Sequence, residues 1–125
     1  MEDAVRMFAA VQLLVIGLSH LLRPQAWIDW FAALKAWGTN GAFANGFLCL
    51  LFGSVIVAFH NVWTGVPMIL TVIGWTQVIK ALVAFTLPEV SLRGFGRARR
   101  PAQFRVAGVL CIAFSGLLLK VLIIG

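Results

Sequence analysis

The sequence predicts an all-α integral membrane protein, a four-helix bundle, and three observations lead to this prediction. Hydrophobic residues make up 62% of the 125 residues and charged residues 11%, with a mean hydropathy of +1.00. A soluble domain of this size cannot bury so much apolar surface, whereas a bilayer can absorb it. The apolar residues gather in four stretches, each close to the ~20 residues that cross a ~30 Å hydrocarbon core as a helix. No barrel-like alternation appears, and in lipid a helix satisfies its own backbone polar groups.

The four expected spans cover about residues 4–22, 41–59, 66–87 and 104–124 of a single transmembrane domain, 1–125. The first span lacks a basic start and a small-residue cleavage site, so we expect no cleavable signal peptide. Cys49 and Cys111 fall inside spans and show no metal-type spacing. We therefore expect buried free thiols and no metal site.

The connection between the first two spans has the features of a short helix in the headgroup region. Pro24 suits a helix start and Gly38 a helix end. Tryptophan is typical of membrane–water interfaces, because its ring is amphipathic. We expect four tryptophans to serve as interface anchors, three in this connection and one in the 60–65 turn: Trp27, Trp30, Trp37 and Trp63.

Basic residues predict the orientation of the chain. The first and third connections lie on the same side of the membrane, and with the adjoining Arg105 they carry most of the positive charge: Arg23, Lys35, Arg93, Arg97, Arg99 and Arg100. The opposite side has Arg6 and Lys120. The positive-inside rule then puts these connections and their interfacial helices in the cytoplasm, and both termini outside. The net charge of +6 is explained in this way without nucleic acid.

The third connection holds the densest positive charge, from Arg93, Arg97, Arg99 and Arg100. Its simplest interpretation is an orientation signal. The same charge predicts binding of anionic lipids at the cytoplasmic face. Docking of an acidic partner is an alternative that the sequence does not separate from lipid binding.

The chain contains an internal repeat, with halves at about 1–62 and 63–125. Residues 46–54 read GFLCLLFGS and residues 108–116 read GVLCIAFSG, at an offset of 62. Upstream, Pro24 matches Pro88 and Phe31 matches Phe95, at an offset of 64. Both halves have two spans and enter the membrane in the same direction. We therefore predict two helical hairpins in a parallel repeat, related by an axis along the membrane normal.

Five polar residues are candidates for a transport path or polar face: Lys80, Gln77, Gln12, Asn45 and His60. A charged lysine inside an apolar span costs free energy, so its presence suggests a function. Lys80 either binds an anion, pairs with a carboxylate or moves a proton or ion, or it snorkels and only sets the depth of its helix.

A helical wheel divides the third span into two faces. Small and polar residues share one face, which we expect to pack inward: Gly74, Gln77, Lys80, Ala81 and Ala84. Bulky residues lie away from it, where we expect lipid: Met68, Trp75, Ile79 and Leu82. Gln12, Gln77 and Ser115 come near one depth, which fits either interhelical hydrogen bonds or a transport path.

Catalysis and cofactors find little support. A bis-histidine haem needs its ligands at one level, and His20 and His60 fall near opposite ends of spans. His60 either caps a helix at the interface or acts as a pH sensor or proton-entry site. Asp29 and Glu89 lie in the cytoplasmic connections, away from any nucleophile–base set. We expect no catalytic residue, no metal and no cofactor.

Three patterns carry a resemblance to a known group. They are L-x-P-x-x-W followed by R-x-x-G, then H-N-x-W, then G-W-x-x-x-x-K. In this chain they comprise Leu22, Pro24 and Trp27; Arg105 and Gly108, with Ser115 in place of a second glycine; His60, Asn61 and Trp63; and Gly74, Trp75 and Lys80. The chain resembles small bacterial inner-membrane proteins of unknown function. The resemblance implies a multi-pass protein of the bacterial inner membrane and brings no activity with it.

Three functions remain open on the sequence. The first is translocation of a small solute, ion or proton by a homo-oligomer, because four helices alone enclose little space. The second is a non-catalytic accessory or assembly subunit of a larger membrane complex. The third is a cofactor-binding membrane enzyme, favoured only by two separated histidines.

Overall fold

The computed structural model describes residues 2–96 and 99–124, and these residues are almost entirely helical. Within them lie six helices: α1 (Glu2–Leu22), α2 (Pro24–Ala36), α3 (Thr39–Phe59), α4 (Pro67–Thr86), α5 (Pro88–Phe95) and α6 (Pro101–Ile124). Four of the six, α1, α3, α4 and α6, are long and apolar enough to cross a membrane. The all-α class and the four long apolar helices are confirmed, with ends within a few residues of those predicted.

Prolines mark most of the helix starts. All four prolines of the chain, Pro24, Pro67, Pro88 and Pro101, are first residues of helices. Proline is favoured there because its φ is already helical and its missing N–H would have no intrahelical partner. The predicted start of α2 at Pro24 is confirmed, and its end near Gly38 also holds. Gly38 has φ 65°, a conformation that glycine tolerates best, and the chain turns there into α3.

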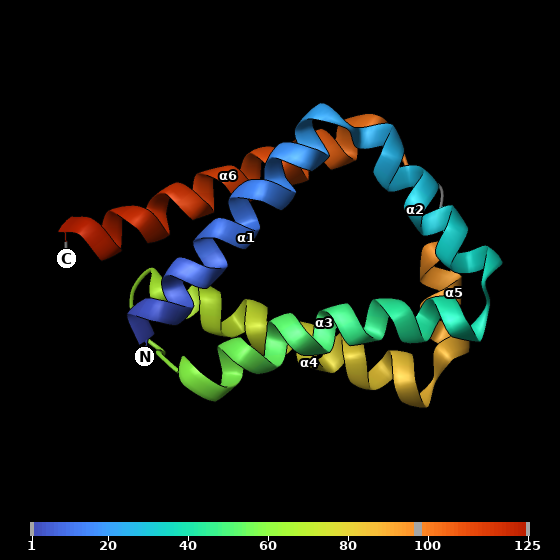
Figure 1. Ribbon diagram of the computed structural model, residues 1–125, viewed down its shortest axis with the longest axis horizontal. Helices are drawn as coiled ribbons and strands as arrows, with labels where there is room; N and C mark the ends of the chain where they lie inside the picture. The colour runs from blue at the N-terminus through green and yellow to red at the C-terminus, as the bar shows by residue number, and fades with distance from the viewer. Residues whose placement is uncertain (1, 97–98, 125) are drawn as a thin grey trace.

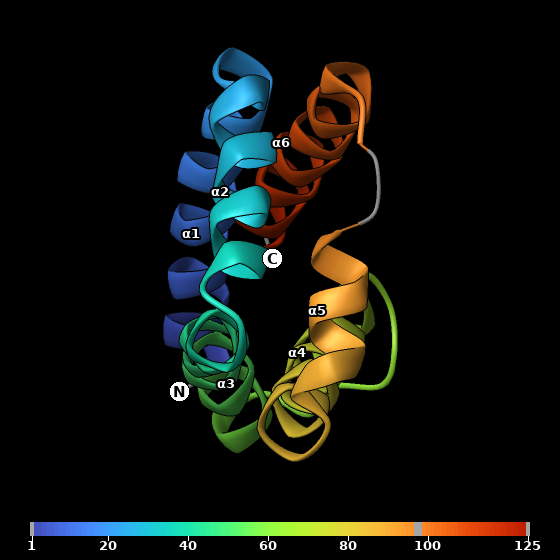
Figure 2. The same cartoon turned by 90° about the vertical axis from the view of Figure 1, so that its right-hand side faces the viewer.

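The long helices pack in two pairs, α1 with α6 and α3 with α4 (Figure 1). The start of α1, the end of α6 and the α3–α4 turn lie toward one end of the molecule, here called the turn end. The two pairs diverge from there, and α2 and α5 lie at the other end (Figure 2). Each long helix therefore has its main partner in the opposite half of the sequence, and α1 and α3 touch only slightly.

Glycines allow close approach of the two helices in each pair. A Cβ added to Gly108 of α6 would lie 2.6 Å from the carbonyl oxygen of Gly17 in α1. A Cβ added to Gly53 of α3 would lie 2.8 Å from the carbonyl oxygen of Gly74 in α4. Small residues let helix backbones come this close, which is how apolar helices associate where lipid competes with side chains.

Two apolar cores lie at the two ends of the molecule. The first lies at the turn end and is buried among α1, α3, α4 and α6: Val5, Ala9, Ala10, Ile56, Leu70 and Leu118. The second joins α2, α3 and α5 at the other end: Leu34, Ala42 and Phe95. The helices between these cores expose many large apolar side chains, as expected of helices that contact lipid.

Candidate functional site

A buried polar network closes the turn end. His60, which ends α3, is fully buried. The guanidinium Nε of Arg6 in α1 donates a hydrogen bond to His60 Nε2 at 3.3 Å. On the other side of the ring, His60 Nδ1 lies 3.1 Å from the hydroxyl of Thr71 in α4. The network therefore joins three helices, and His60 does more than cap the end of its own helix.

The hydrogen bonds continue from Arg6 through the ring of His60 to Thr71. Because Arg6 can only donate, His60 Nε2 accepts and the ring proton is on Nδ1. His60 Nδ1 then donates to Thr71 Oγ1, which also accepts from the Val62 N–H at 3.1 Å and donates to the Val62 carbonyl at 2.8 Å. The hydroxyl thus uses its donor and both acceptor positions.

Helix α4 follows the predicted division of faces with one correction. The small residues Gly74, Ala81 and Ala84 are buried, and Gln77 is half-buried. The bulky residues predicted to meet lipid are all exposed: Met68, Trp75, Ile79 and Leu82. Lys80, however, is exposed and does not pack inward. It lies on the edge of the buried face, one residue before Ala81.

The remaining mid-helix candidates lie on other helices. Gln12 of α1 is half-buried. Asn45 of α3 is also half-buried, and its amide donates to the sulfur of Cys49 in the same helix at 3.8 Å. Ser115 makes the interhelical hydrogen bond that the sequence suggested, donating to the Ala10 carbonyl at 2.7 Å. The five polar candidates are thus spread over α1, α3 and α4, with His60 apart at the turn end.

The four predicted anchor tryptophans fall into two groups. Trp37 and Trp63 are more than half exposed, at 63% and 57%. Trp27 and Trp30 are half-buried and pack inside the protein. The indole N–H of Trp27 donates to the Ser19 hydroxyl at 2.9 Å, and its ring stacks on that of His20 with centroids 4.2 Å apart. Trp27 therefore ties α2 to α1.

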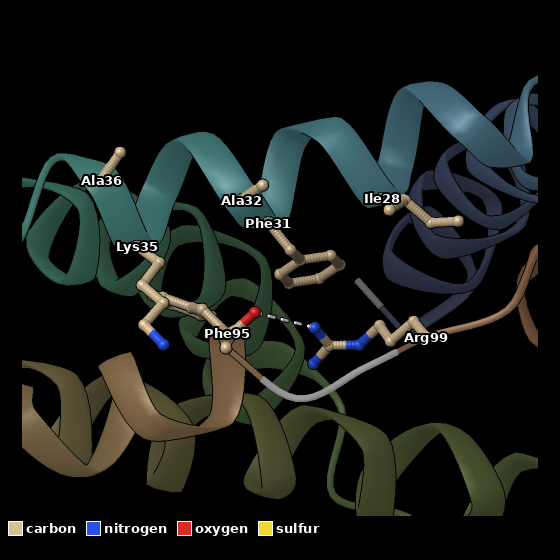
Figure 3. Close-up of a pocket in the computed structure, with 8 residues that line it drawn as sticks. Ile28, Phe31, Ala32, Lys35, Ala36, Phe95 and Arg99 are labelled. Carbon is tan, nitrogen blue, oxygen red and sulfur yellow. Dashed lines mark hydrogen bonds between the residues drawn. The ribbon is translucent and has the colours of Figure 1, made fainter.

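A pocket of about 700 Å³ lies between α2 and the end of α5. Eight residues line it: Ile28, Phe31, Ala32, Lys35, Ala36, Phe95, Gly96 and Arg99. Figure 3 shows Phe31 and Lys35 on the side of α2 that faces α5. The lining residues that the structure describes include two cations and no acid.

Arg99 is held in place at this pocket. Its guanidinium donates to the carbonyl oxygens of Phe95 and Gly94 at 3.2 and 3.0 Å, and thereby caps α5. It also lies 4.3 Å from the centroid of the Phe31 ring, a cation–π contact. Of the other predicted basic residues, Arg93 and Arg100 are exposed, and Arg97 lies outside the described residues.

Sequence reasoning missed several of these residues. Arg6 and Thr71 carry no local signal, because only tertiary packing brings them to His60. Lys35 and Phe31 did carry a signal in the sequence. Lys35 and Arg99 are 64 residues apart, as are Phe31 and Phe95, which is the offset of the repeat.

The two cysteines are free thiols as predicted, but each is only partly buried. Among the described residues, no group of three or more His, Cys, Asp or Glu side chains is placed to hold a metal ion. No protein-family model matches the chain, and comparisons with curated proteins and with solved structures find no significant match.

Proposed function

We propose that this chain is a multi-pass protein of the bacterial inner membrane that acts, as an oligomer, in the translocation of a small solute, ion or proton. One observation carries the proposal. The two helix pairs are sealed together at the turn end by an apolar core and the Arg6–His60–Thr71 network, and they diverge toward α2 and α5. A bundle closed at one end and splayed at the other is suited to opening alternately to the two sides of a membrane.

Equivalent contacts in the two pairs support an internal repeat. A Cβ on Gly108 would lie 3.1 Å from the Cβ of His20, and one on Gly46 would lie 3.0 Å from the Cβ of Ala84. Gly46 and Gly108 are 62 residues apart, and His20 and Ala84 are 64 apart. The α1–α6 and α4–α3 pairs thus match at the offsets found in the sequence.

This correspondence implies interlocked halves. Under the repeat, α1 corresponds to α4 and α3 to α6, so each pair takes one helix from each half. The rings of the matched residues Phe31 and Phe95 contact each other, with centroids 5.8 Å apart. Contact between matched residues is expected only near a two-fold axis, which we place between α2 and α5, along the membrane normal.

The repeat also indicates which way Lys80 faces. Its counterpart in α1 is Ile16, one turn after Gln12 and two turns after Phe8. The Phe8 ring packs on Phe52 of α3, so this side of α1 faces the α3–α4 pair. We infer from this correspondence that Lys80, although exposed, lies on the side of α4 that faces the α1–α6 pair, the position in which a lysine could meet a translocated ion.

Positive charge supports the orientation. The end that holds α2 and α5 carries Arg23, Lys35, Arg93, Arg99 and Arg100, which the positive-inside rule assigns to the cytoplasm. The turn end and both termini are then periplasmic.

A flux assay tests translocation. The purified protein is reconstituted into liposomes, and proton and anion flux are followed with internal dyes. We expect Lys80→Met to lower flux to the level of empty liposomes while oligomer size stays unchanged. Lys120→Met removes the same charge from an exposed site in α6 and should leave flux unaltered. Equal flux in the Lys80→Met and unmodified proteins would leave Lys80 with a role in helix depth only.

Native mass spectrometry of protein gently extracted from its own membrane tests the oligomer. A homo-oligomer without other proteins supports translocation. A stoichiometric larger partner would instead make the chain an accessory subunit of that partner's complex.

A further inference from the structure

The pocket between α2 and α5 is a binding site for a single anionic phospholipid, we propose, with Lys35 and Arg99 holding the headgroup phosphate. The proposal rests on the membrane location given above and does not depend on translocation. It differs from general attraction to a basic surface, because it assigns a defined cavity and two particular cations.

The charge of the pocket selects an anion. Lys35 and Arg99 are the charged residues among the eight that line it. Two of the guanidinium N–H groups of Arg99 bind carbonyl oxygens at the C-terminal end of α5, and its remaining N–H groups are left to bind an acceptor. The Lys35 ammonium lies against Gly96, at the place where a side chain on that residue would begin. Arginine and lysine together are suited to phosphate, since a guanidinium matches two phosphate oxygens at once.

The walls of the pocket select a lipid over a free ion. Apart from the two cations, its lining consists of Gly96 and five apolar residues: Ile28, Phe31, Ala32, Ala36 and Phe95. Inorganic phosphate gains nothing from this surface, whereas the glycerol and upper acyl carbons of a lipid can cover it. The volume of about 700 Å³ is within the usual range of small-molecule sites.

The position of the pocket suits the same ligand. The pocket lies near the two-fold axis proposed above, because Phe31 and Lys35 of α2 stand 64 residues before Phe95 and Arg99. A lipid bound there would contact both halves at the end where the helix pairs diverge. Its phosphate would sit at headgroup depth, next to helices placed in the interface.

The test is lipid binding by the full-length protein in neutral detergent, followed by native mass spectrometry. Phosphatidylglycerol is titrated, with phosphatidylcholine and inorganic phosphate as separate arms. We expect saturable binding of one phosphatidylglycerol per chain and weaker binding of the other two. Lys35→Gln should weaken phosphatidylglycerol binding about five-fold, the effect of one basic residue near an anionic headgroup.

Two matched controls separate a pocket from diffuse charge. Arg93→Gln makes the same charge change on α5 at an exposed residue outside the pocket, and should leave binding nearly unaltered. Gly96→Leu fills the pocket without changing charge and should weaken binding. Gly94→Leu, where an added Cβ meets nothing within 4 Å, should not.

The proposal fails if Arg93→Gln and Lys35→Gln weaken binding equally, because the charge would then act without a site. Phosphatidylcholine binding as tightly as phosphatidylglycerol would also overturn it, and so would inorganic phosphate that binds as well as the lipid. Helix content measured by circular dichroism confirms that each variant is folded. If the protein binds phosphatidylglycerol as expected but shows no flux in liposomes, that result would count against translocation only.

Discussion

The hydroxyl of Ser115 donates a hydrogen bond to the carbonyl oxygen of Ala10, 105 positions earlier in the chain. Gly53 lies 62 positions before Ser115 and Gly74 lies 64 positions after Ala10, and the backbones of these two glycines meet in the other helix pair. The two pairs are thus joined by different chemistry at these positions. A hydroxyl joins α1 to α6 there, and α3 and α4 are joined by direct backbone contact.

Removing that hydroxyl should weaken the α1–α6 pair. Ser115 is buried, and interhelical hydrogen bonds of this kind contribute about 0.6–2 kcal/mol. We expect Ser115→Ala to lower the free energy of unfolding in micelles by that amount. Ser54→Ala is the control, because Ser54 is exposed and its hydroxyl bonds only to Leu51 of its own helix. Equal effects of the two changes would contradict a bond between helices.

A methyl group added where Gly17 and Gly108 meet should destabilise the protein more than one added on an exposed surface. Gly108→Ala would place its Cβ 2.6 Å from the Gly17 carbonyl oxygen, so the helices must move apart. We expect a loss of about 1–3 kcal/mol in unfolding free energy. Gly116→Ala in the same helix meets nothing within 4 Å, and should be neutral or slightly stabilising. A stable Gly108→Ala protein would mean that α1 and α6 do not approach this closely.

Thr71 should be essential to the stability of the turn end. In Thr71→Val the side chain keeps its shape, but the Val62 N–H and the ring N–H of His60 lose their acceptor. An unsatisfied buried polar group costs about 1–3 kcal/mol, and we expect at least that loss in thermal or denaturant unfolding.

Two further variants check the cause of that loss. Thr71→Ser retains the hydroxyl and should restore most of the stability. Thr76→Val removes an exposed hydroxyl that bonds only to the Val72 carbonyl, and should have little effect. If Thr71→Ser were as unstable as Thr71→Val, the methyl group and not the hydrogen bonds would explain the loss.

Topology can be read from cysteine labelling in whole cells. In a background lacking Cys49 and Cys111, a cysteine at Thr64 should react with a membrane-impermeant maleimide, because we propose that the turn end faces the periplasm. A cysteine at Gln103 should react only after the membrane is permeabilised, because we propose that the basic side faces the cytoplasm. The opposite pattern would reverse the orientation, and labelling of both sites in intact cells would indicate two orientations.

Much of the secondary structure follows from local chemistry. The length of the apolar stretches determines four long helices, because a bilayer-length apolar segment leaves its backbone no other way to satisfy its polar groups. Prolines determine where helices begin, and Gly38 determines the turn into α3. The exposed and buried faces of α4 were also predictable, because small and bulky residues alternate at helical spacing from Met68 to Ala84.

The sequence by itself therefore determined that the chain is helical, where its helices begin and which face of α4 is buried. Only the tertiary structure decided that α1 pairs with α6, because the apolar and glycine-bearing faces of the four long helices are alike and any of them could pair. The same holds for the burial of His60 beside Arg6 and Thr71, and for the joining of Lys35 and Arg99 in one pocket. Each of these contacts depends on how helices far apart in the sequence are placed in space, and no local pattern encodes that.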